Sequence, residues 1–316
     1  MLKSKRWLAV ALLVGLIALL GGMLLTQAQE FPVKVIDDRG REITIPERPE
    51  RIVVAGMPLY AEILVDIGAL DRLVGVTDSP DNPPEVQGLP KVGPPISPSV
   101  ELILALHPDL VLGAWGAVRD RLEAAGLIVL TTGPIGSLTD IFGTIRTVGT
   151  AVGNLAEANA LIGRIAEEVV ELESRVLGLE PVPAAFIYML APDAPPYAAG
   201  SGTIEHELLL RAGGLNLFAD VQGYPQVSLE ELLKRDPQVI FTDPAQVENV
   251  LGSRLLEGLS AVREGKVWGI KASEVTSTRV ALALRKMAEL LHPEAFPEEQ
   301  ASVSVSVSAA AAAGPS

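Results

Sequence analysis

Few residues in this sequence could carry out covalent or redox chemistry. The 316 residues include no cysteine, which excludes disulfides, thiolate metal ligands, cysteine nucleophiles and lipid attachment through an N-terminal cysteine. The histidines are His107, His206 and His292, whereas a zinc or manganese site needs several imidazoles and carboxylates that converge. His107 and His292 each precede proline, so we expect surface or helix-capping roles for them. His206 is interpreted as a solvated helix residue, and we expect no resident metal ion or cofactor.

The motifs of nucleotide-binding and hydrolytic enzymes are also missing. Gly200-Ser201-Gly202 begins like a dinucleotide-binding fingerprint, but Glu205 stands where that motif needs its third glycine. No glycine-rich loop ends in Lys-Ser or Lys-Thr, and no Gly-x-Ser-x-Gly elbow presents a serine nucleophile. We therefore predict that the protein is not an enzyme.

Non-covalent binding is favoured instead, because aromatic and proline residues gather on expected loops. Aromatic residues make up only 4% of the chain, yet several follow the ends of expected strands, where open α/β sheets bind ligands. Stacking and apolar burial could hold a large planar or apolar ligand there. The ligand-binding residues predicted on this basis are Met57, Pro58, Tyr60, Trp115, Pro196, Tyr197 and Tyr224. The alternative is that these side chains only seal the edges of the core, and Trp268, inside a strand pattern, is expected in the core.

Strands and helices alternate along the chain in the order that builds parallel sheets with helices on their faces. A hairpin is expected first, with strands at 33–37 and 41–45 around Asp38-Arg39-Gly40. A first lobe then has expected strands at 51–55, 73–77, 109–113 and 128–132, and helices at 59–67, 98–106 and 118–125. A second lobe has expected strands at 184–190, 238–242 and 266–270, and helices at 204–212, 229–235, 253–262 and 278–291. The lobes are alike in kind, without a close sequence repeat.

A long helical pattern connects the two lobes. Apolar residues recur at helical spacing over residues 138–176, after Ser137 as a suitable N-cap. Gly153-Asn154 is expected to break the pattern and to leave a second helix at 155–177, roughly 35 Å long at 1.5 Å per residue. Such a helix can brace two lobes. The predicted fold class is therefore α/β, with two αβ lobes of mostly parallel sheets bridged by a long α-helix.

The two ends of the chain and its charge indicate where the protein works. Lys3, Lys5 and Arg6 precede an apolar run at 7–25, which is typical of a secretory signal peptide; an uncleaved membrane anchor is the alternative. Either one places the remaining chain outside the cytoplasm, in the periplasm or at the cell surface. The formal net charge of −14 argues against a nucleic-acid partner. The expected domains are a signal peptide at 1–28, an N-terminal lobe at 29–136, a helical linker at 137–180, a C-terminal lobe at 181–297 and a disordered low-complexity tail at 298–316.

Several segments resemble one known family. The segments "RIVVAGMPLYAEILVDIGALDRLVGVT" (51–77), "NPPEVQGLPKVG" (82–93) and "SVELILALHPDLVLG" (99–113) resemble the first lobe of the solute-binding proteins of iron-siderophore and cobalamin ABC importers. The segment "YAAGSGTIEHELLLRAGGLNLFADVQGYPQVSLEELLKRDPQVIF" (197–241) is similar to the second lobe. The resemblance extends over about residues 31–296, and it is the combination of segments that is specific to the family.

The resemblance implies a fold, a partner and docking residues. Members of this family, the helical-backbone or class III periplasmic binding proteins, hold a ligand between two lobes that one long helix bridges. One glutamate on each lobe meets arginines of the membrane permease. The matching positions here are Glu62 and Glu230, with Glu231 an adjacent possibility, and the protein is expected to be a monomer.

The resemblance also implies a metal chelate as the ligand, with cobalamin slightly favoured over a ferric siderophore. A strongly anionic catecholate complex should require basic residues in the cleft, where only Arg279 and, less clearly, Arg119 are available. Haem is an alternative ligand, with Tyr60, Tyr197 or His206 to bind its iron. The sequence also leaves open a bare-metal receptor and, less plausibly, a chelatase-type enzyme on the same fold.

Overall fold

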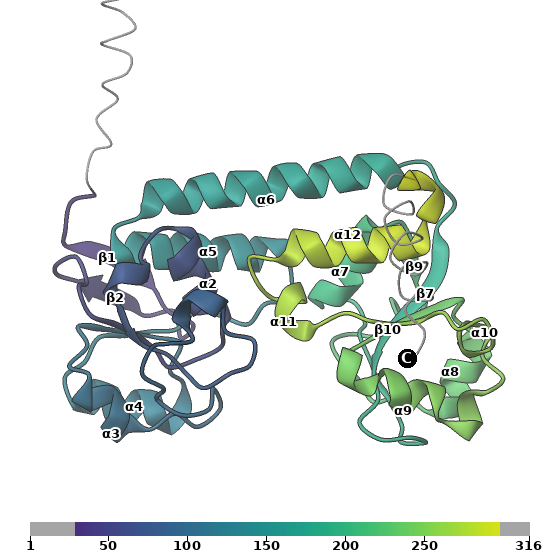
Figure 1. Cartoon of the computed structure of the whole chain (residues 1–316), viewed down its shortest axis with the longest axis horizontal. Helices are drawn as coiled ribbons and strands as arrows, with labels where there is room; N and C mark the ends of the chain where they lie inside the picture. Colours follow the sequence, from purple (N-terminus) through teal and green to yellow (C-terminus); the bar gives the residue numbers. More distant parts are fainter. Residues whose placement is uncertain (1–28, 298–316) are drawn as a thin grey trace, which may run out of the picture.

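The computed structural model describes residues 29–297, which form two lobes beneath one long helix (Figure 1). The first described strands form the antiparallel hairpin of β1 (Val33–Ile36) and β2 (Glu42–Ile45), as predicted. Its turn contains Gly40 at a φ of 73°, a conformation that glycine adopts without strain. The predicted fold class is confirmed.

The sheet of the N-terminal lobe is entirely parallel. Its strands lie in the order β4 (Leu73–Gly75), β3 (Ile52–Val54), β5 (Leu110–Leu112) and β6 (Val129–Leu130). The helices of this lobe are α2 (Leu59–Asp66), α3 (Val100–Ala105) and α4 (Gly116–Ala124). Alternate strand residues face opposite sides, so that Val54 packs in the same core as α2, whereas Val53 packs in a second core with α3 and α4.

The sheet of the C-terminal lobe is mixed. The main order is β11 (Val267–Gly269), β10 (Val239–Thr242), β7 (Val182–Tyr188) and β8 (Tyr197–Ala198), and β9 (Gly214–Asn216) also pairs with β7. Only the β7–β8 pair is antiparallel among the strand pairs of this sheet in residues 181–297. The helices here are α7 (Ile204–Arg211), α8 (Leu229–Arg235), α9 (Val247–Leu251), α10 (Ser260–Arg263), α11 (Ala272–Val275) and α12 (Val280–Leu291).

The sequence patterns missed some elements of the C-terminal lobe. The short β8, β9, α9 and α11 were not predicted, because periodicity over two to five residues does not identify an element. The helix predicted at 253–262 is wrong. A 3₁₀ turn at Arg254–Leu256 and the separate helix α10 replace it, with Gly258 between them.

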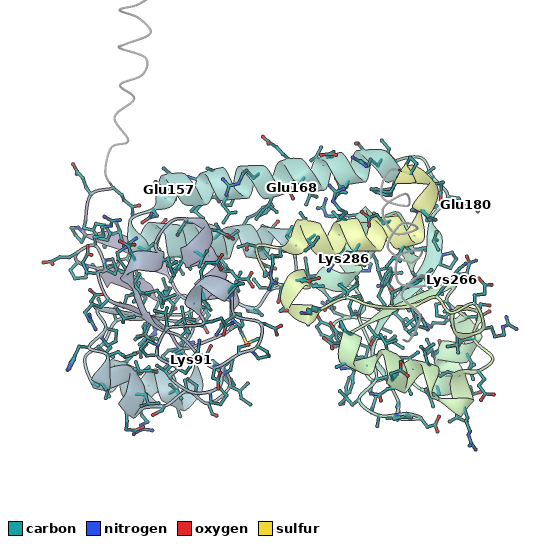
Figure 2. The ribbon with its side chains drawn as sticks, viewed as in Figure 1. Lys91, Glu157, Glu168, Glu180, Lys266 and Lys286 are labelled. Carbon is teal, nitrogen blue, oxygen red and sulfur yellow. The ribbon has the colours of Figure 1, made fainter. Side chains whose placement is uncertain are left out.

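The predicted long helix is α6 (Leu155–Val176), which follows α5 (Leu138–Val152) after a break at Gly153. Gly153 has a φ of 76° and ends α5 in the left-handed conformation typical of helix C-termini. Across its 22 residues, about 33 Å, α6 packs first on α5 and then on α12 (Figure 1). Charged residues such as Glu157 and Glu168 lie on its exposed positions (Figure 2).

One hydrophobic core runs along α6 through both lobes. It includes α2 and α5 of the first half and α7 and α12 of the second, together with the buried face of α6. The lobes therefore share a core instead of meeting only through a linker. None of the helices in residues 29–297 is both long and apolar enough to cross a membrane.

One local unit occurs in both lobes, although the sequence shows no close repeat. Ser99 and Ser228 cap α3 and α8, and each side chain accepts a hydrogen bond from the backbone N–H three residues later. Each helix is followed by a residue of positive φ before proline, His107 at 46° and Asp236 at 43°, and the central strands β5 and β10 come next.

Candidate functional site

A cavity of about 440 Å³ lies where the carboxyl ends of N-lobe strands meet α11 of the other lobe. The loops after β3, β5 and β6 form one wall, and the segment around α11 forms the other. The lining residues are Met57, Pro58, Leu59, Tyr60, Ser79, Asp81, Gly113, Trp115, Thr131, Thr132, Gly133, Pro134, Ile135, Ala272, Ser273, Thr276 and Ser277. Four of the predicted ligand-binding residues, Met57, Pro58, Tyr60 and Trp115, are among them.

The N-lobe wall is apolar and aromatic. Met57 and Trp115 are 59% and 54% exposed, so both present a large apolar surface to a ligand. Tyr60 is buried instead, with its hydroxyl accepting a hydrogen bond from the Thr132 backbone N–H at 2.9 Å and sharing another with the Thr132 hydroxyl at 2.9 Å. Burial raises the pKa of Tyr60. A phenol held in this way shapes the wall and is poorly placed to ligate iron.

Gly113 allows the Tyr60 ring to lie beneath the loop that carries Trp115. Its φ of 81° lies in the left-handed region, and a Cβ at this position would lie 2.7 Å from Cε2 of Tyr60. A side chain at position 113 would therefore displace the ring from the cavity wall.

The C-lobe wall is rich in hydroxyl groups. Ser273, Thr276 and Ser277 face the cavity from α11 and the turn after it. The hydroxyl of Ser273 is buried without a hydrogen-bond partner in the part of the chain that the structure describes. Asp81 is the single charged side chain among the described residues that line the cavity. The site therefore suits a ligand with an apolar face and hydrogen-bonding groups, and among these described lining residues no cationic side chain is present to attract a polyanion.

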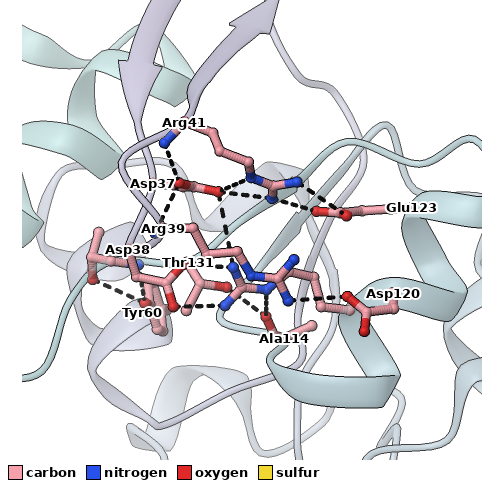
Figure 3. A network of polar contacts seen from close by, with 11 residues as sticks. Asp37, Asp38, Arg39, Arg41, Tyr60, Ala114, Asp120, Glu123 and Thr131 are labelled. Atoms are coloured by element: carbon pink, nitrogen blue, oxygen red, sulfur yellow. Dashed lines mark hydrogen bonds and ion pairs between the residues drawn. The ribbon is translucent and has the colours of Figure 1, made fainter.

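A polar network fixes the loop that carries Trp115 (Figure 3). Arg119, 2% exposed, donates to both carboxylate oxygens of Asp38 at 2.6 and 2.7 Å and to the Ala114 carbonyl at 3.0 Å. The Asp38 backbone N–H donates to the Thr131 carbonyl. The weaker expectation that Arg119 could face a ligand is therefore wrong, because Asp38 and Ala114 occupy its donors.

The aromatic residues predicted in the C-terminal lobe lie elsewhere. Pro196, Tyr197 and Tyr224 do not line the described cavity. Tyr224 is 46% exposed, and its hydroxyl donates to Glu205 at 2.6 Å, as does that of Tyr188. Burial and the adjacent Glu205 carboxylate raise the pKa of Tyr188 and of Tyr224. A ligand role for the C-lobe aromatic residues stays a prediction.

Two residues predicted for different roles form one ion pair between the lobes. Arg279 Nη2 lies 2.6 Å from Glu62 Oε1, and the Thr278 hydroxyl donates to Glu62 Oε2 at 3.3 Å. Glu62 is only 5% exposed. Burial raises the pKa of Glu62, and the charge of Arg279 opposes that shift. Arg279 therefore contacts Glu62 and lies outside the described cavity, which departs from its predicted position.

The histidines do not gather at the cavity. His206 Nδ1 lies 3.0 Å from the Asn216 side-chain nitrogen, and His292, buried at the end of α12, lies 2.9 Å from the Gly213 carbonyl. Within residues 29–297 no cluster of three or more His, Asp or Glu side chains could hold a metal ion. Trp268, expected in the core, is 38% exposed on the edge strand β11.

Besides Ser79 and Asp81, sequence reasoning missed two stretches that line the cavity, 131–135 and 272–277. The first follows β6 and the second follows β11. The rule that ligands bind beyond strand carboxyl ends could have found both. They were overlooked because they contain hydroxyl, glycine and proline residues but no aromatic residue.

Both the sequence and the fold match known proteins. Residues 53–274 match the model of the family described as periplasmic binding protein. The chain is 31% identical over 231 residues to the Vitamin B12-binding protein of Vibrio cholerae serotype O1, which covers 71% of this chain and 82% of that protein. It is 27% identical over 282 residues to the ABC transporter substrate-binding lipoprotein YvrC of Bacillus subtilis (strain 168), covering 86% and 89%. The periplasmic heme-binding protein RhuT from Roseiflexus sp. RS-1, in apo form, superposes with a TM-score of 0.70 at 25% identity over 78% of this chain and 99% of that one.

Proposed function

Because the chain belongs to the periplasmic binding protein family, we propose that it is the extracytoplasmic substrate-binding component of an ABC importer. It captures a metal chelate between its lobes and delivers it to a membrane permease, without making or breaking a bond. The observation that carries this proposal is the cavity that both lobes line, with Trp115 and Met57 on one side and hydroxyl groups on the other. The predicted signal peptide lies outside the described residues, and the monomeric state stays a prediction.

Cobalamin is the ligand that the lining supports best. Its corrin ring offers an apolar face for Trp115, and its amide side chains can donate hydrogen bonds to the Thr276 hydroxyl, which itself donates to the Ala272 carbonyl. A cavity of about 440 Å³ would enclose only part of so large a ligand, with the remainder in the mouth between the lobes. The Vitamin B12-binding relative supports the same choice.

Haem and catecholate siderophores fit the lining less well. Haem carries two propionates and needs an axial ligand, but no basic residue or histidine lines the described cavity, and the Tyr60 hydroxyl is engaged by Thr132. A ferric tris-catecholate is strongly anionic, and the charged residue of the described lining is Asp81. A neutral hydroxamate complex stays the second candidate.

A binding panel tests this proposal. We expect the melting temperature to rise with cyanocobalamin or cobinamide, since a ligand at 100 times its dissociation constant stabilises the folded state by about 2.7 kcal/mol. The panel includes a ferric hydroxamate, haem and free Fe³⁺, which distinguish the candidate ligands from one another. Trp115→Ala should weaken binding about 30-fold, as loss of a buried aromatic anchor typically does. The control Trp268→Ala, at a half-exposed position outside the cavity, should bind like the parent protein. Absence of a shift with every chelate would contradict the proposal.

We further propose that one exposed carboxylate on each lobe docks onto arginines of the permease. Glu230 is exposed at the start of α8. Glu62, its predicted counterpart, is already paired with Arg279 and almost inaccessible. The local unit that occurs in both lobes offers Glu101 instead. Glu101 lies two residues after the capping Ser99, just as Glu230 lies two residues after the capping Ser228. The Glu101 side chain is exposed. Its partner Arg121 is itself 61% exposed, so a permease arginine could compete for Glu101.

A further inference from the structure

Two segments on opposite lobes each line the cavity and then supply one partner of an ion pair. On the N-terminal lobe, residues 57–60 line the cavity, and Glu62 lies two positions further along α2. On the other lobe, residues 272–277 include four lining residues, and Arg279 also lies two positions further on. The ion pair therefore joins the same two backbone segments that form the opposing walls.

The Glu62–Arg279 contact is close, and its two side chains differ in how deeply they are buried. One oxygen of the Glu62 carboxylate accepts a hydrogen bond from Arg279 at 2.6 Å, and the other oxygen accepts one from the Thr278 hydroxyl at 3.3 Å. Glu62 is 5% exposed, whereas Arg279 keeps 39% of its side chain exposed. A second hollow of about 200 Å³, lined by Glu62, Asp66, Pro83, Pro84, Thr278 and Arg279 among others, lies against the pair. Both partners of the pair therefore line this second hollow, and neither lines the ligand cavity.

The energetics make this contact dependent on the spacing of the lobes. An isolated carboxylate as buried as Glu62 is costly, and the loss of its partner leaves that charge uncompensated. Arg279 can meet it only while the α11 segment lies against α2. Any outward movement of this segment therefore exchanges a charge-assisted hydrogen bond for an unpaired buried charge.

We propose that Glu62 and Arg279 form a latch that sets the spacing of the two cavity walls and thereby raises the affinity for the ligand. This inference rests on the proposed function only in taking the cavity as the ligand site. Both are positioning residues, since they contact each other outside the cavity lining. The latch pre-organises the ligand-free protein, so that less ordering is required when the chelate enters.

Calorimetry with cyanocobalamin and cobinamide measures the ligand affinity that the latch is proposed to raise. Arg279→Met and Glu62→Gln should each weaken binding by about tenfold, in the usual range of coupling between two sites. Arg279→Lys keeps the charge and should restore part of the affinity. The double variant should bind no more weakly than the weaker single variant, because the two changes remove one shared interaction. Glu171→Gln is the matched control, since its pair with Arg175 lies within α6.

A distance measurement in the ligand-free protein provides the deciding test. The natural chain has no cysteine, so Ala124→Cys on α4 and Glu257→Cys in the other lobe, both at exposed positions, can be spin-labelled uniquely. Arg279→Met should broaden the distance distribution between the labels and shift it to longer values, whereas Glu171→Gln should not. An unchanged distribution would overturn the latch whatever the affinities. If the parent protein bound no chelate, the proposed function would fail while the distances would still decide the latch.

Discussion

Arg119 supports the N-lobe wall although it does not line the cavity. It joins the turn after β1 to the Ala114 carbonyl, one residue before Trp115. Asp37, in the same turn, accepts hydrogen bonds from the backbone N–H groups of Arg39 and Arg41 and from the Arg41 side chain. Asp38 therefore connects the hairpin to the ligand loop through charge-assisted hydrogen bonds from Arg119, whereas Asp37 holds the turn itself (Figure 3).

The titration of Asp37 yields a testable pH dependence. Burial alone would raise the pKa of Asp37, but the hydrogen bonds from Arg41 and Arg39 outweigh it and hold the pKa below 3.8. An aspartate with a lowered native pKa contributes stability that is present above its unfolded pKa and lost as the pH falls through its native pKa. Asp37→Asn should therefore lower the free energy of unfolding by about 1–3 kcal/mol at pH 7, and by less at pH 3.

Urea unfolding at the two pH values measures this difference. Asp120→Asn is the control, because Asp120 forms an exposed pair with Arg39 and should cost at most about 1 kcal/mol at either pH. Equal losses for Asp37→Asn at pH 7 and pH 3 would show that the ionised carboxylate is not the stabilising group.

At the scale of elements, the close contact of α5 with α6 fixes the direction of the long helix. Gly149 of α5 faces Ala158 of α6, and a Cβ on Gly149 would lie 2.3 Å from the Ala158 Cβ. Arg72, 3% exposed, strengthens the same corner by donating to the Val152 carbonyl and to the Asn154 side chain. The direction of α6 in turn determines where α12 and the second lobe lie.

Two glycine substitutions in α5 should have opposite effects. Gly149→Ala overlaps Ala158, and overpacking of this kind costs about 1–3 kcal/mol of stability. Gly143→Ala meets nothing within 4 Å on an exposed position of the same helix, and should stabilise by about 0.5–1 kcal/mol. Chemical denaturation of both variants measures whether each change lowers or raises the free energy of unfolding. A stabilised Gly149→Ala would mean that α5 and α6 are further apart than the structure places them.

For the whole molecule, the shared core along α6 favours small movements of the lobes. Residues of α2, α5, α7 and α12 belong to one buried cluster with α6, so a wide opening would expose apolar surface at about 25 cal/mol per Å². We therefore expect docking onto a permease to involve two carboxylates, Glu101 and Glu230, whose separation changes little.

Uptake of labelled cobalamin by cells that carry the permease tests the docking residues. Glu101→Ala and Glu230→Ala should each lower uptake more than tenfold, because losing one partner of an interfacial charge pair costs about 2–5 kcal/mol. Both variants should keep the affinity of the parent protein. Glu62→Ala should instead lose affinity, as a latch residue. The opposite result would identify Glu62 as the docking residue. In that case Glu62→Ala would lose uptake while keeping its affinity, and Glu101→Ala would show normal uptake.

The sequence by itself determined the α/β class, most strands and helices and the break at Gly153, because these follow from local periodicity and from turn chemistry. It also selected Met57, Tyr60 and Trp115, since each follows a strand whose carboxyl end faces the cavity. Only the tertiary structure decided that Arg279 meets Glu62, that Arg119 meets Asp38, and that 272–277 completes the cavity. Those contacts join residues far apart in the chain, and the packing of elements on one another, such as α12 on α6, brings them together rather than any local pattern.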